Sequence, residues 1–359
     1  MRFVHVSDVH WGMLPDSDKP WAKDRAYDIK ETFAKVISKT KELNADLLLI
    51  SGDLFHRSPL IADLKEINSL FNTIPYTKII IVAGANDRLR KNSNVLSFNF
   101  AKNVHYITSE DIESIYFQDL NVEIHAFSYY TQELKTRMID NLNIKDDDKT
   151  HIVVAYGGDT THMPIDLDKL TNQNISYYAL GSVHKPTELV EKKIVYPGSL
   201  EPLDISEQGD RGIFIGDINT ITKQVERVYF QPMSKLHYIA LSVTVSKETT
   251  NEELSRTIVS EIRKRGDENI YRLRLIGKHD PETVFDFQNL THLVRIVDII
   301  DESEPEYNFA ELTKNHAEDM IGFYIQALQK ENPKEMSEIE KKALYYGINA
   351  LLKTGEVKL

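Results

Sequence analysis

Aspartate and histidine side chains follow several apolar runs of this 359-residue sequence, at the points where predicted strands end. Asp8 and His10 come after the first run, and Asp53 comes after the second, within the motif GDLFH. The glycine-led turn GAND, residues 84–87, comes after the third run, and His184 closes the motif GSVH after a later one. Carboxylate and imidazole groups together suit manganese, iron or zinc. Each element alone is common by chance, but the ordered set predicts a metal centre.

The runs that precede these residues have the composition of buried strands. Nearly continuous apolar segments that alternate with segments of helical periodicity are typical of a sheet covered on both faces. The predicted strands cover residues 2–7, 47–51, 78–83, 122–127, 151–156, 177–180 and 194–196, with a hairpin at 212–216 and 225–230. Helices are predicted over residues 24–43 and 61–74. The pattern predicts two packed sheets with flanking helices, with the site at the carboxyl ends of the strands.

The rest of the chain predicts two smaller parts. A boundary is expected near residues 231–235, and the acidic, proline-containing segment 301–307 is interpreted as a linker. Between them, Thr250 is a predicted helix N-cap in a strand–helix–strand module. The module's elements are predicted at 236–245, 251–264 and 271–276, and two amphipathic helices are predicted at 309–329 and 337–352. The expected domains are residues 1–231, 236–300 and 308–359.

The composition limits the compartment and the partners. The chain contains no cysteine, which excludes thiolate metal sites and disulfides and fits a reducing compartment. Its first residues lack the apolar run of a signal peptide, and no segment approaches a membrane span. We therefore expect a cytoplasmic protein without a membrane partner. The formal net charge of -12 argues against a broad basic DNA-binding face, although a local basic patch or a basic partner can supply phosphate contacts.

Three longer motifs resemble those of the calcineurin-like metallophosphoesterases, and among them the SbcD type of DNA-repair nuclease. They are GDLFH at residues 52–56, YYALGSVHKP at 177–186 and YPGSLEPLDISEQGDRG at 196–212. The resemblance is strong over residues 1–216. It implies an α/β (α+β) fold with a four-layer α/β/β/α domain, a small α/β capping domain and a C-terminal helical hairpin. It also implies DNA contact by the capping domain, docking of the hairpin on an SbcC-type coiled-coil ATPase, and a homodimer.

The resemblance further implies two metal ions, most commonly manganese, that share one aspartate. The ligands of the first metal correspond to Asp8, His10, Asp53 and His184. All four residues have the expected type. The resemblance therefore implies that the first metal site is intact.

The second metal site is not intact by the same comparison. Apart from the shared aspartate, its ligands correspond to Ala85, Tyr156 and Ser182, where the family has asparagine, histidine and histidine. Asn86 stands where the family has a catalytic histidine, and an amide cannot act as a general acid near neutral pH. Two-metal hydrolysis needs both ions to clamp the attacking and leaving oxygens. We therefore expect one well-liganded metal and impaired hydrolysis.

Several alternatives are open for individual residues. Asn86 can take the place of the missing asparagine ligand, and His151 or His162 can replace the lost histidine. His56, within GDLFH, either contacts DNA or substrate phosphate beside the site or has a packing or hydrogen-bonding role. Two arginines after the third motif are either DNA-backbone contacts or solvated loop residues. They are Arg88 and Arg90. The changed positions are compatible with natural loss or with a designed inactive variant.

The leading hypothesis is the nuclease subunit of an SbcC–SbcD-like complex that processes DNA double-strand-break ends, with impaired phosphodiester hydrolysis. One alternative is an active manganese-dependent DNA exonuclease or endonuclease with a rebuilt site. Another is a non-catalytic scaffold that couples the ATPase to DNA. A small-molecule phosphodiesterase is a further alternative, although such an enzyme needs neither the capping domain nor the terminal helices.

Overall fold

The computed structural model describes residues 1–142, 144, 147–288, 290, 293–328 and 336–353. The chain divides into two compact units, Met1–Tyr238 and Ile239–Leu359. Among the described residues, no helix has both the length and the apolar character needed to cross a membrane.

The first sheet of the Met1–Tyr238 unit has six strands in the order β12-β11-β1-β2-β3-β4. Their bounds are β1 Arg2–Val6, β2 Leu47–Ser51, β3 Lys78–Val82, β4 Val104–Tyr106, β11 Gly212–Asn219 and β12 Gln224–Pro232. Strands β1 to β4 run parallel, so β1, β2 and β3 end at the same edge. Helices α1 (Ala22–Glu42) and α2 (Ile61–Phe71) provide the crossovers that parallel strands need.

The second sheet also has six strands, in the order β5-β6-β7-β8-β10-β9. Their bounds are β5 Glu113–Phe117, β6 Val122–Ala126, β7 Thr150–Tyr156, β8 Tyr177–Gly181, β9 Thr187–Val190 and β10 Ile194–Tyr196. The four central strands are parallel, and β5 and β9 pair antiparallel at the two edges. The short helix α3 (Leu167–Thr171) and the 3-10 helix η1 (Asn94–Ser97) complete the unit.

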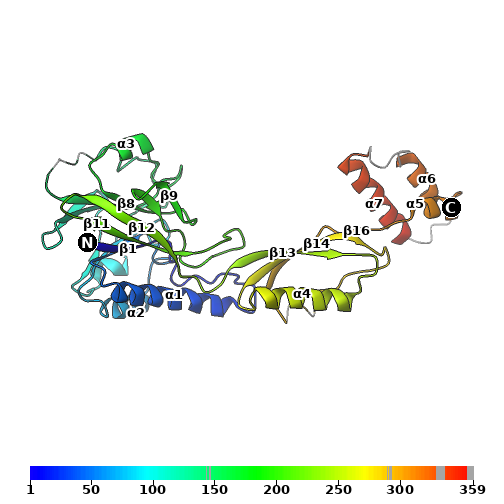
Figure 1. Cartoon of the computed structure of the whole chain (residues 1–359), viewed down its shortest axis with the longest axis horizontal. Helices are drawn as coiled ribbons and strands as arrows, with labels where there is room; N and C mark the ends of the chain where they lie inside the picture. Colours follow the sequence, from blue (N-terminus) through cyan, green and yellow to red (C-terminus); the bar gives the residue numbers. More distant parts are fainter. Residues whose placement is uncertain (143, 145–146, 289, 291–292, 329–335, 354–359) are drawn as a thin grey trace. The chain divides into compact units, whose positions relative to one another are not determined.

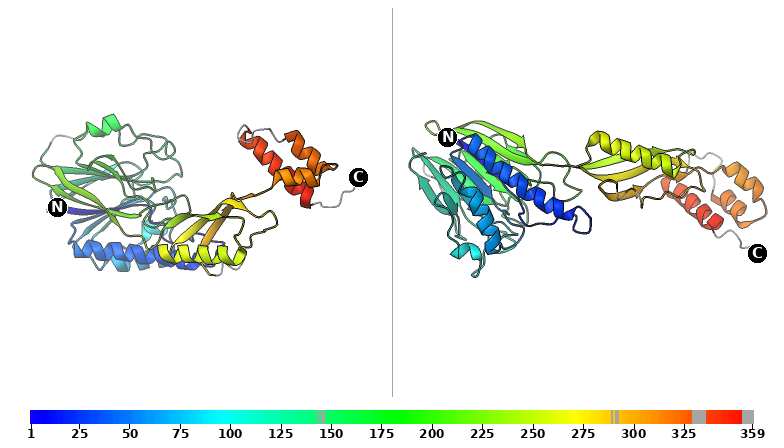
Figure 2. Two further views of the ribbon diagram at one scale, coloured as in Figure 1. Left: turned by 45° about the vertical axis from the view of Figure 1, so that its right-hand side comes forward. Right: turned by 90° about the horizontal axis from the view of Figure 1, so that it is seen from below.

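Apolar side chains hold the layers of this unit together. Leu47 and Leu49 of the first sheet share a buried cluster with Ile152 and Val154 of the second. Helices α1 and α2 cover the other face of the first sheet (Figures 1 and 2). The other face of the second sheet packs against loop residues and Leu170 of α3. The predicted α/β/β/α arrangement is therefore confirmed, although its fourth layer contains little helix.

The Ile239–Leu359 unit begins in a sheet whose strand order is β13-β14-β15, with β16 beside β14. The elements are β13 Tyr238–Val245, α4 Asn251–Arg265, β14 Ile270–His279, β15 Ile296–Asp301 and β16 Glu304–Pro305. Thr250 caps α4 through a hydrogen bond from the Glu253 amide, as predicted. The sequence interpretation missed β15, and the supposed linker contains β16. An acidic, proline-containing segment is compatible with an edge strand, because such a strand tolerates both residue types.

The last described helices are α5 (Phe309–Asn315), α6 (Met320–Leu328) and α7 (Glu338–Lys353). The single helix predicted over residues 309–329 is thus two helices, and its last residue, Gln329, lies outside the described residues. The Asp319 carboxylate explains the break, because it accepts hydrogen bonds from the Ile321 and Gly322 amides at the start of α6. Ile325, Leu344 and other apolar side chains form a small core between the helices.

Candidate metal centre

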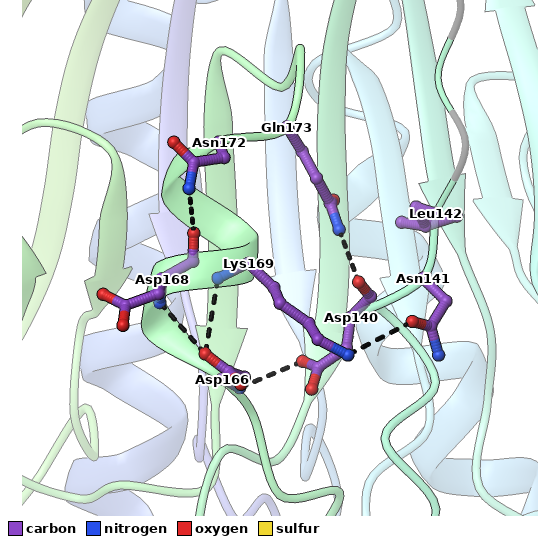
Figure 3. Close-up of a pocket in the computed structure, with 8 residues that line it drawn as sticks. All are labelled: Asp140, Asn141, Leu142, Asp166, Asp168, Lys169, Asn172 and Gln173. Atoms are coloured by element: carbon purple, nitrogen blue, oxygen red, sulfur yellow. Dashed lines mark hydrogen bonds between the residues drawn. The ribbon is translucent and has the colours of Figure 1, made fainter.

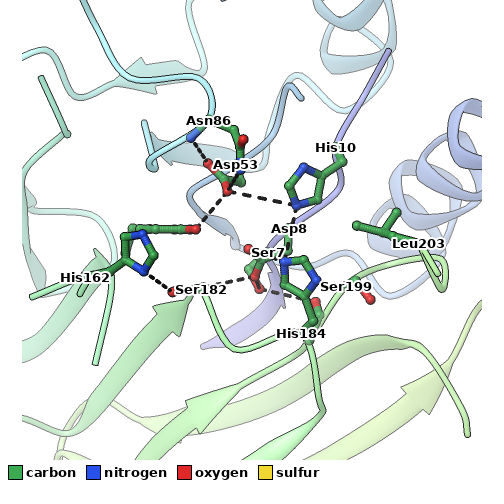
Figure 4. A network of polar contacts seen from close by, with 12 residues as sticks. Ser7, Asp8, His10, Asp53, Asn86, His162, Ser182, His184, Ser199 and Leu203 are labelled. Atoms are coloured by element: carbon green, nitrogen blue, oxygen red, sulfur yellow. Dashed lines mark hydrogen bonds and ion pairs between the residues drawn. The ribbon is translucent and has the colours of Figure 1, made fainter. Parts of the chain in front are cut away.

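The predicted ligands come together where strands of both sheets end. Asp8 follows β1 and Asp53 follows β2 in the first sheet, while His184 follows β8 in the second. Asp8, His10 and Asp53 all have positive φ angles, of 48°, 52° and 48°. Such angles are uncommon for residues other than glycine, and they often mark functional sites. These turns place Asp8 and His10 beside His184, and Asp53 beside His10 (Figure 4).

Three of these residues present ligand atoms that lie within 4.8 Å of one another: Asp8, His10 and His184. The Nε2 atoms of His10 and His184 are 3.4 Å apart, and Asp8 Oδ1 lies 3.6 Å from His184 Nε2. Asp53 Oδ2 lies somewhat farther away, 4.0 Å from His10 Nε2. Burial lowers the pKa of His10 to about 3, so its imidazole is neutral and can act as a ligand.

The Asp8 carboxylate tests whether these residues fit a metal ion. Its Oδ2 atom accepts hydrogen bonds from the Ser7 hydroxyl and the Ser182 amide. Its Oδ1 atom is buried without a hydrogen-bond partner, and burial raises the pKa of Asp8 to about 6. A buried oxygen with no donor is costly unless a cation satisfies it. Asp8 therefore has one oxygen held in place and one directed at the other ligands, as a metal site requires.

Glu207 contacts the predicted ligand His184, and the sequence interpretation did not single it out. Its Oε1 atom accepts a 2.5 Å hydrogen bond from His184 Nδ1, and its Oε2 atom accepts one from the Ser199 hydroxyl. Burial alone would lower the pKa of His184, but Glu207 and Asp8 raise it to about 9. The contact directs the Nδ1 proton to Glu207, so Nε2 can bind a metal when the ion displaces its proton, in the manner of carboxylate–histidine–metal triads. The signal was present, because Glu207 lies within the long motif at residues 196–212.

Hydrogen-bond donors occupy the other side of Asp53. Its Oδ2 atom accepts a 2.8 Å hydrogen bond from the Tyr156 hydroxyl and a 2.6 Å bond from Asn86 Nδ2. Its Oδ1 atom accepts a bond from the Asn86 amide. Burial and then the charge of Asp53 raise the pKa of Tyr156, so the hydroxyl stays protonated and donates. Two neutral donors therefore occupy the carboxylate that the resemblance assigns to a second metal.

The Tyr156 ring also fills space beside Asp53. A Cβ atom added at Gly84 would stand 2.7 Å from the ring atom Cδ2, and one added at Gly52 would also collide with the ring. Ala85 is buried in the same apolar cluster as Tyr156. The Ser182 hydroxyl points to Asp159 instead, where it donates a 2.8 Å hydrogen bond. Of the three positions that correspond to ligands of the second metal, Ala85 makes apolar contacts, while Tyr156 and Ser182 donate hydrogen bonds.

Two histidines were alternatives for the lost ligand, and the structure separates them. His162 lies beside Tyr156, with ring centroids 5.6 Å apart, and its Nδ1 atom pairs with Asp159 at 2.9 Å. His151 lies at the other end of β7 from Tyr156, and its ring contacts His125. The alternative that His151 replaces the lost histidine is therefore wrong, because the length of β7 separates it from Asp53.

The remaining predicted residues have contacts of their own. His56 Nδ1 lies 3.3 Å from His10 Nδ1, so this half-buried ring contacts a predicted ligand. Arg88 donates a 2.7 Å hydrogen bond to the carbonyl of Ala85, which fixes its side chain along the third loop. Arg90 is exposed, and its backbone amide bonds to Ser93. Of the two arginines, Arg90 is the one left accessible to a phosphate backbone.

Asp87 connects two of the loops that carry the site. The carboxylate accepts hydrogen bonds from the Gly84 amide at 2.7 Å and the Phe55 amide at 3.1 Å. Burial, and then the nearby Asp53, raise the pKa of Asp87 to about 8. The sequence interpretation placed this residue in the third motif without giving it a role. Its contacts indicate that it holds the β2 and β3 loops in register.

We expect Asp87→Ala to lower the free energy of unfolding by about 2–4 kcal/mol, because two buried N–H groups lose their acceptor. Urea denaturation of both proteins measures the change. Asp111→Ala, at an exposed carboxylate, is the control and should change the value little. An Asp87→Ala protein as stable as the parent would show that the loops do not depend on this contact.

A surface pocket lies beside α3, and none of the predicted ligands lines it (Figure 3). Two of its three aspartates have a basic partner, since Arg137 pairs with both Asp140 and Asp166. Lys169 reaches the Asn141 side chain across it. None of the residues that line it belongs to the Asp8 cluster, so the chemistry is assigned to the cluster rather than to this pocket.

Comparisons with known proteins agree with this geometry. A family model described as calcineurin-like phosphoesterase matches residues 1–195. The chain belongs to this family. The fold and the site therefore define a metallophosphoesterase, of a family that depends on divalent metals.

The relatives include DNA-repair proteins. The DNA double-strand break repair protein Mre11 of Archaeoglobus fulgidus is 27% identical over 234 residues, which are 58% of this chain and 52% of that protein. Mre11 of Methanocaldococcus jannaschii is 26% identical over 238 residues, or 61% of this chain and 63% of that protein. The metallophosphoesterase YhaO of Bacillus subtilis, which is described as uncharacterized, is 26% identical over 77% of this chain and 72% of that protein. The match to the first of these relatives thus spans about half its length.

Proposed function

We propose that this chain is the nuclease-type subunit of an SbcC–SbcD-like complex that acts on DNA double-strand-break ends, with impaired phosphodiester hydrolysis. The observation that carries the proposal is the asymmetry around Asp53. On one side, Asp8, His10 and His184 gather their ligand atoms within 4.8 Å. On the other side, Tyr156 and Asn86 donate hydrogen bonds to the same carboxylate.

Four residues would hold one divalent metal ion, with manganese as the expected ion: Asp8, His10, Asp53 and His184. Such an ion supplies a Lewis acid that polarises a phosphate oxygen. His184 is positioned by Glu207, and Asp8 is positioned by Ser7 and the Ser182 amide. These contacts preorganise the site for a phosphate group. They do not supply the second clamp that in-line displacement requires.

The Tyr156 and Asn86 donors explain how the fold can persist without a second ion. Each donor satisfies part of the buried Asp53 carboxylate, which would otherwise be costly to bury. Neither carries a positive charge, so neither stabilises the charge that develops on a reacting phosphate. Asn86 also lacks the acid function of the family's histidine. The proposal is therefore binding of a phosphodiester with slow cleavage.

The second unit supports a role in DNA contact. Along α4, Arg256, Arg263 and Lys264 line a shallow surface hollow together with serine side chains. Basic and hydroxyl groups are common partners of a phosphate backbone. This local patch offers a DNA surface despite the negative net charge of the chain. We propose residues 236–300 as the capping domain that contacts DNA.

The terminal helices support a docking role. Met320 and Phe323 of α6 are 58% and 59% exposed, and Tyr346 of α7 is 73% exposed. Exposed large apolar side chains on a helix pair are typical of a surface that binds another helix. We propose that residues 308–359 dock on the coiled coil of an SbcC-type ATPase, and that residues 1–231 form a homodimer.

A second candidate function is an active nuclease with a rebuilt site. Two observations favour it. Asn86, one residue beyond the lost asparagine ligand, has its side chain 2.6 Å from Asp53 Oδ2, and His162 lies beside Tyr156. The same site could also belong to a scaffold that binds DNA without any cleavage. Cleavage assays separate these candidates.

The proposal predicts that the purified chain binds a DNA hairpin and a linear duplex and leaves both intact in the presence of Mn²⁺. Fluorescence anisotropy measures binding, and denaturing gels measure cleavage. Arg256→Glu with Arg263→Glu should weaken binding at least about tenfold, since phosphate contacts dominate affinity. Lys65→Glu with Lys102→Glu, which changes the charge equally at exposed sites on the first unit, is the matched control. Rapid Mn²⁺-dependent cleavage would support the rebuilt nuclease instead.

A further inference from the structure

We propose an additional metal site, the Glu123 cluster, in which Glu123, His125 and His151 bind a zinc-class divalent ion. It is separate from both the Asp8 cluster and the second metal site at Asp53. The three side chains come from adjacent strands of the second sheet. Their ligand atoms lie within 4.8 Å of one another. Nothing in the proposed nuclease chemistry uses them, so this inference goes beyond that function and does not depend on it.

The register of the sheet places these residues on one face. Glu123 and His125 are two residues apart on β6, so their side chains point the same way. On β7, His151 is the parallel partner of Glu123. On β5, Ser114 is the antiparallel partner of His125. The convergence is therefore built into strand pairing rather than into a loose loop.

The distances between the ligand atoms fit a tetrahedral ion. His125 Nε2 lies 3.0 Å from His151 Nδ1, and His151 Nδ1 lies 3.5 Å from Glu123 Oε2. With metal–ligand bonds of about 2.0–2.1 Å, the ligands of a tetrahedral zinc ion are about 3.3 Å apart. Two histidines and one glutamate form a known type of zinc site that leaves a fourth position for water. Both histidines are 4% exposed, while Glu123 is half-buried at the rim.

A second set of contacts orients each ligand. His151 Nε2 lies 3.0 Å from the Asp147 carboxylate, and His125 Nδ1 lies 2.7 Å from the Ser114 hydroxyl. The other oxygen of Glu123 accepts a 2.9 Å hydrogen bond from Lys149. Metal-binding histidines commonly have such a partner on the nitrogen that does not face the ion.

The protons show why a cation fits between these groups. Asp147 can only accept, so His151 carries its proton on Nε2 and presents an Nδ1 lone pair to Glu123 Oε2 and His125 Nε2. The Nδ1 lone pair and the Glu123 oxygen lie 3.5 Å apart, and both can bind one cation. A divalent ion can bind these two atoms and His125 Nε2 when Ser114 accepts the proton of His125 Nδ1. Without an ion, His125 Nε2 donates to His151 Nδ1 and the Ser114 hydroxyl donates to His125 Nδ1.

Co²⁺ binding to the full chain tests the site, because tetrahedral Co²⁺ has a strong visible spectrum. The background protein carries Asp8→Asn and His184→Gln, which remove the first cluster from the measurement. We expect one tetrahedral Co²⁺ per chain, displaced by an equivalent of Zn²⁺. Adding Glu123→Gln and His151→Gln should abolish the spectrum, and Asp147→Asn should weaken binding by about 10–100-fold.

Glu113→Gln is the matched control, since it changes another half-buried carboxylate of the same sheet outside the cluster. It should leave Co²⁺ affinity unchanged. Circular dichroism confirms folding, and if the double change at Glu123 and His151 does not fold, Glu123→Gln alone should still weaken binding by at least about tenfold. A background protein that binds no Co²⁺, or one whose spectrum survives the changes at Glu123 and His151, would overturn the proposal.

Discussion

Restoring four residues together is expected to raise the rate of Mn²⁺-dependent DNA cleavage by at least ~10³-fold. The protein regains the ligands of a second metal ion and a general acid. The variant carries Ala85→Asn, Asn86→His, Tyr156→His and Ser182→His. The substrates are a DNA hairpin and a linear duplex, and the readout is the initial rate of cleavage. The parent chain should be nearly silent on both.

The structure explains why the changes must be combined. The Tyr156 ring and Ala85 share one buried cluster, so an asparagine at position 85 alone would place a polar side chain among apolar ones. Tyr156→His removes both the ring volume and the hydroxyl that donates to Asp53. Tyr156→Phe is a useful contrast, because it removes only the hydroxyl and keeps the obstruction. It should not restore cleavage.

A further control adds Asp8→Asn to the restored variant. This change removes the first metal's ligand and should return cleavage to the level of the parent. A parent chain that already cleaves as fast as the restored variant would mean that other residues, such as Asn86 and His162, complete the site.

Loss of Mn²⁺ affinity is the second large effect that we expect. His184→Gln should weaken binding at least ~100-fold, because one of the few protein ligands is lost. Glu207→Gln should weaken it by about 10–100-fold, since Glu207 fixes the orientation of the His184 ring. Isothermal titration calorimetry measures both in a Glu123→Gln, His151→Gln background, which removes the Glu123, His125 and His151 cluster from the measurement. His162→Gln is the control and should have no effect, because its partner is Asp159.

The result for His162→Gln also separates two accounts of the site. If the rebuilt nuclease is correct, His162 contributes to metal binding and its loss weakens Mn²⁺ affinity. If His184→Gln leaves affinity unchanged, the ion does not bind at the Asp8 cluster at all.

Much of the site could be predicted from the sequence because strand ends have local signals. The apolar runs before Asp8 and Asp53 marked β1 and β2, and parallel pairing then fixed which loops meet. The motif around His184 indicated that a strand of the second sheet, β8, also ends beside the site. These inferences needed only periodicity, motif order and the resemblance to a family.

Other features depend on tertiary contacts that a sequence does not display. The hydrogen bonds from Tyr156 and Asn86 to Asp53 join the end of β7 to the loops after β2 and β3. The break between α5 and α6 depends on one capping carboxylate, Asp319, within an otherwise helical pattern. The strand β16 was missed because acidic residues and proline resemble a linker, while its pairing with β14 is non-local.

The number of Mn²⁺ ions bound per chain tests the central claim most directly. Native mass spectrometry or electron paramagnetic resonance can count them in a Glu123→Gln, His151→Gln background. These two changes remove the Glu123 cluster from the count. The account predicts one ion per chain in this background and two when all four positions are also restored. Two ions in the background without the restored residues would contradict the account, because Tyr156 and Asn86 would then not exclude the second ion at Asp53.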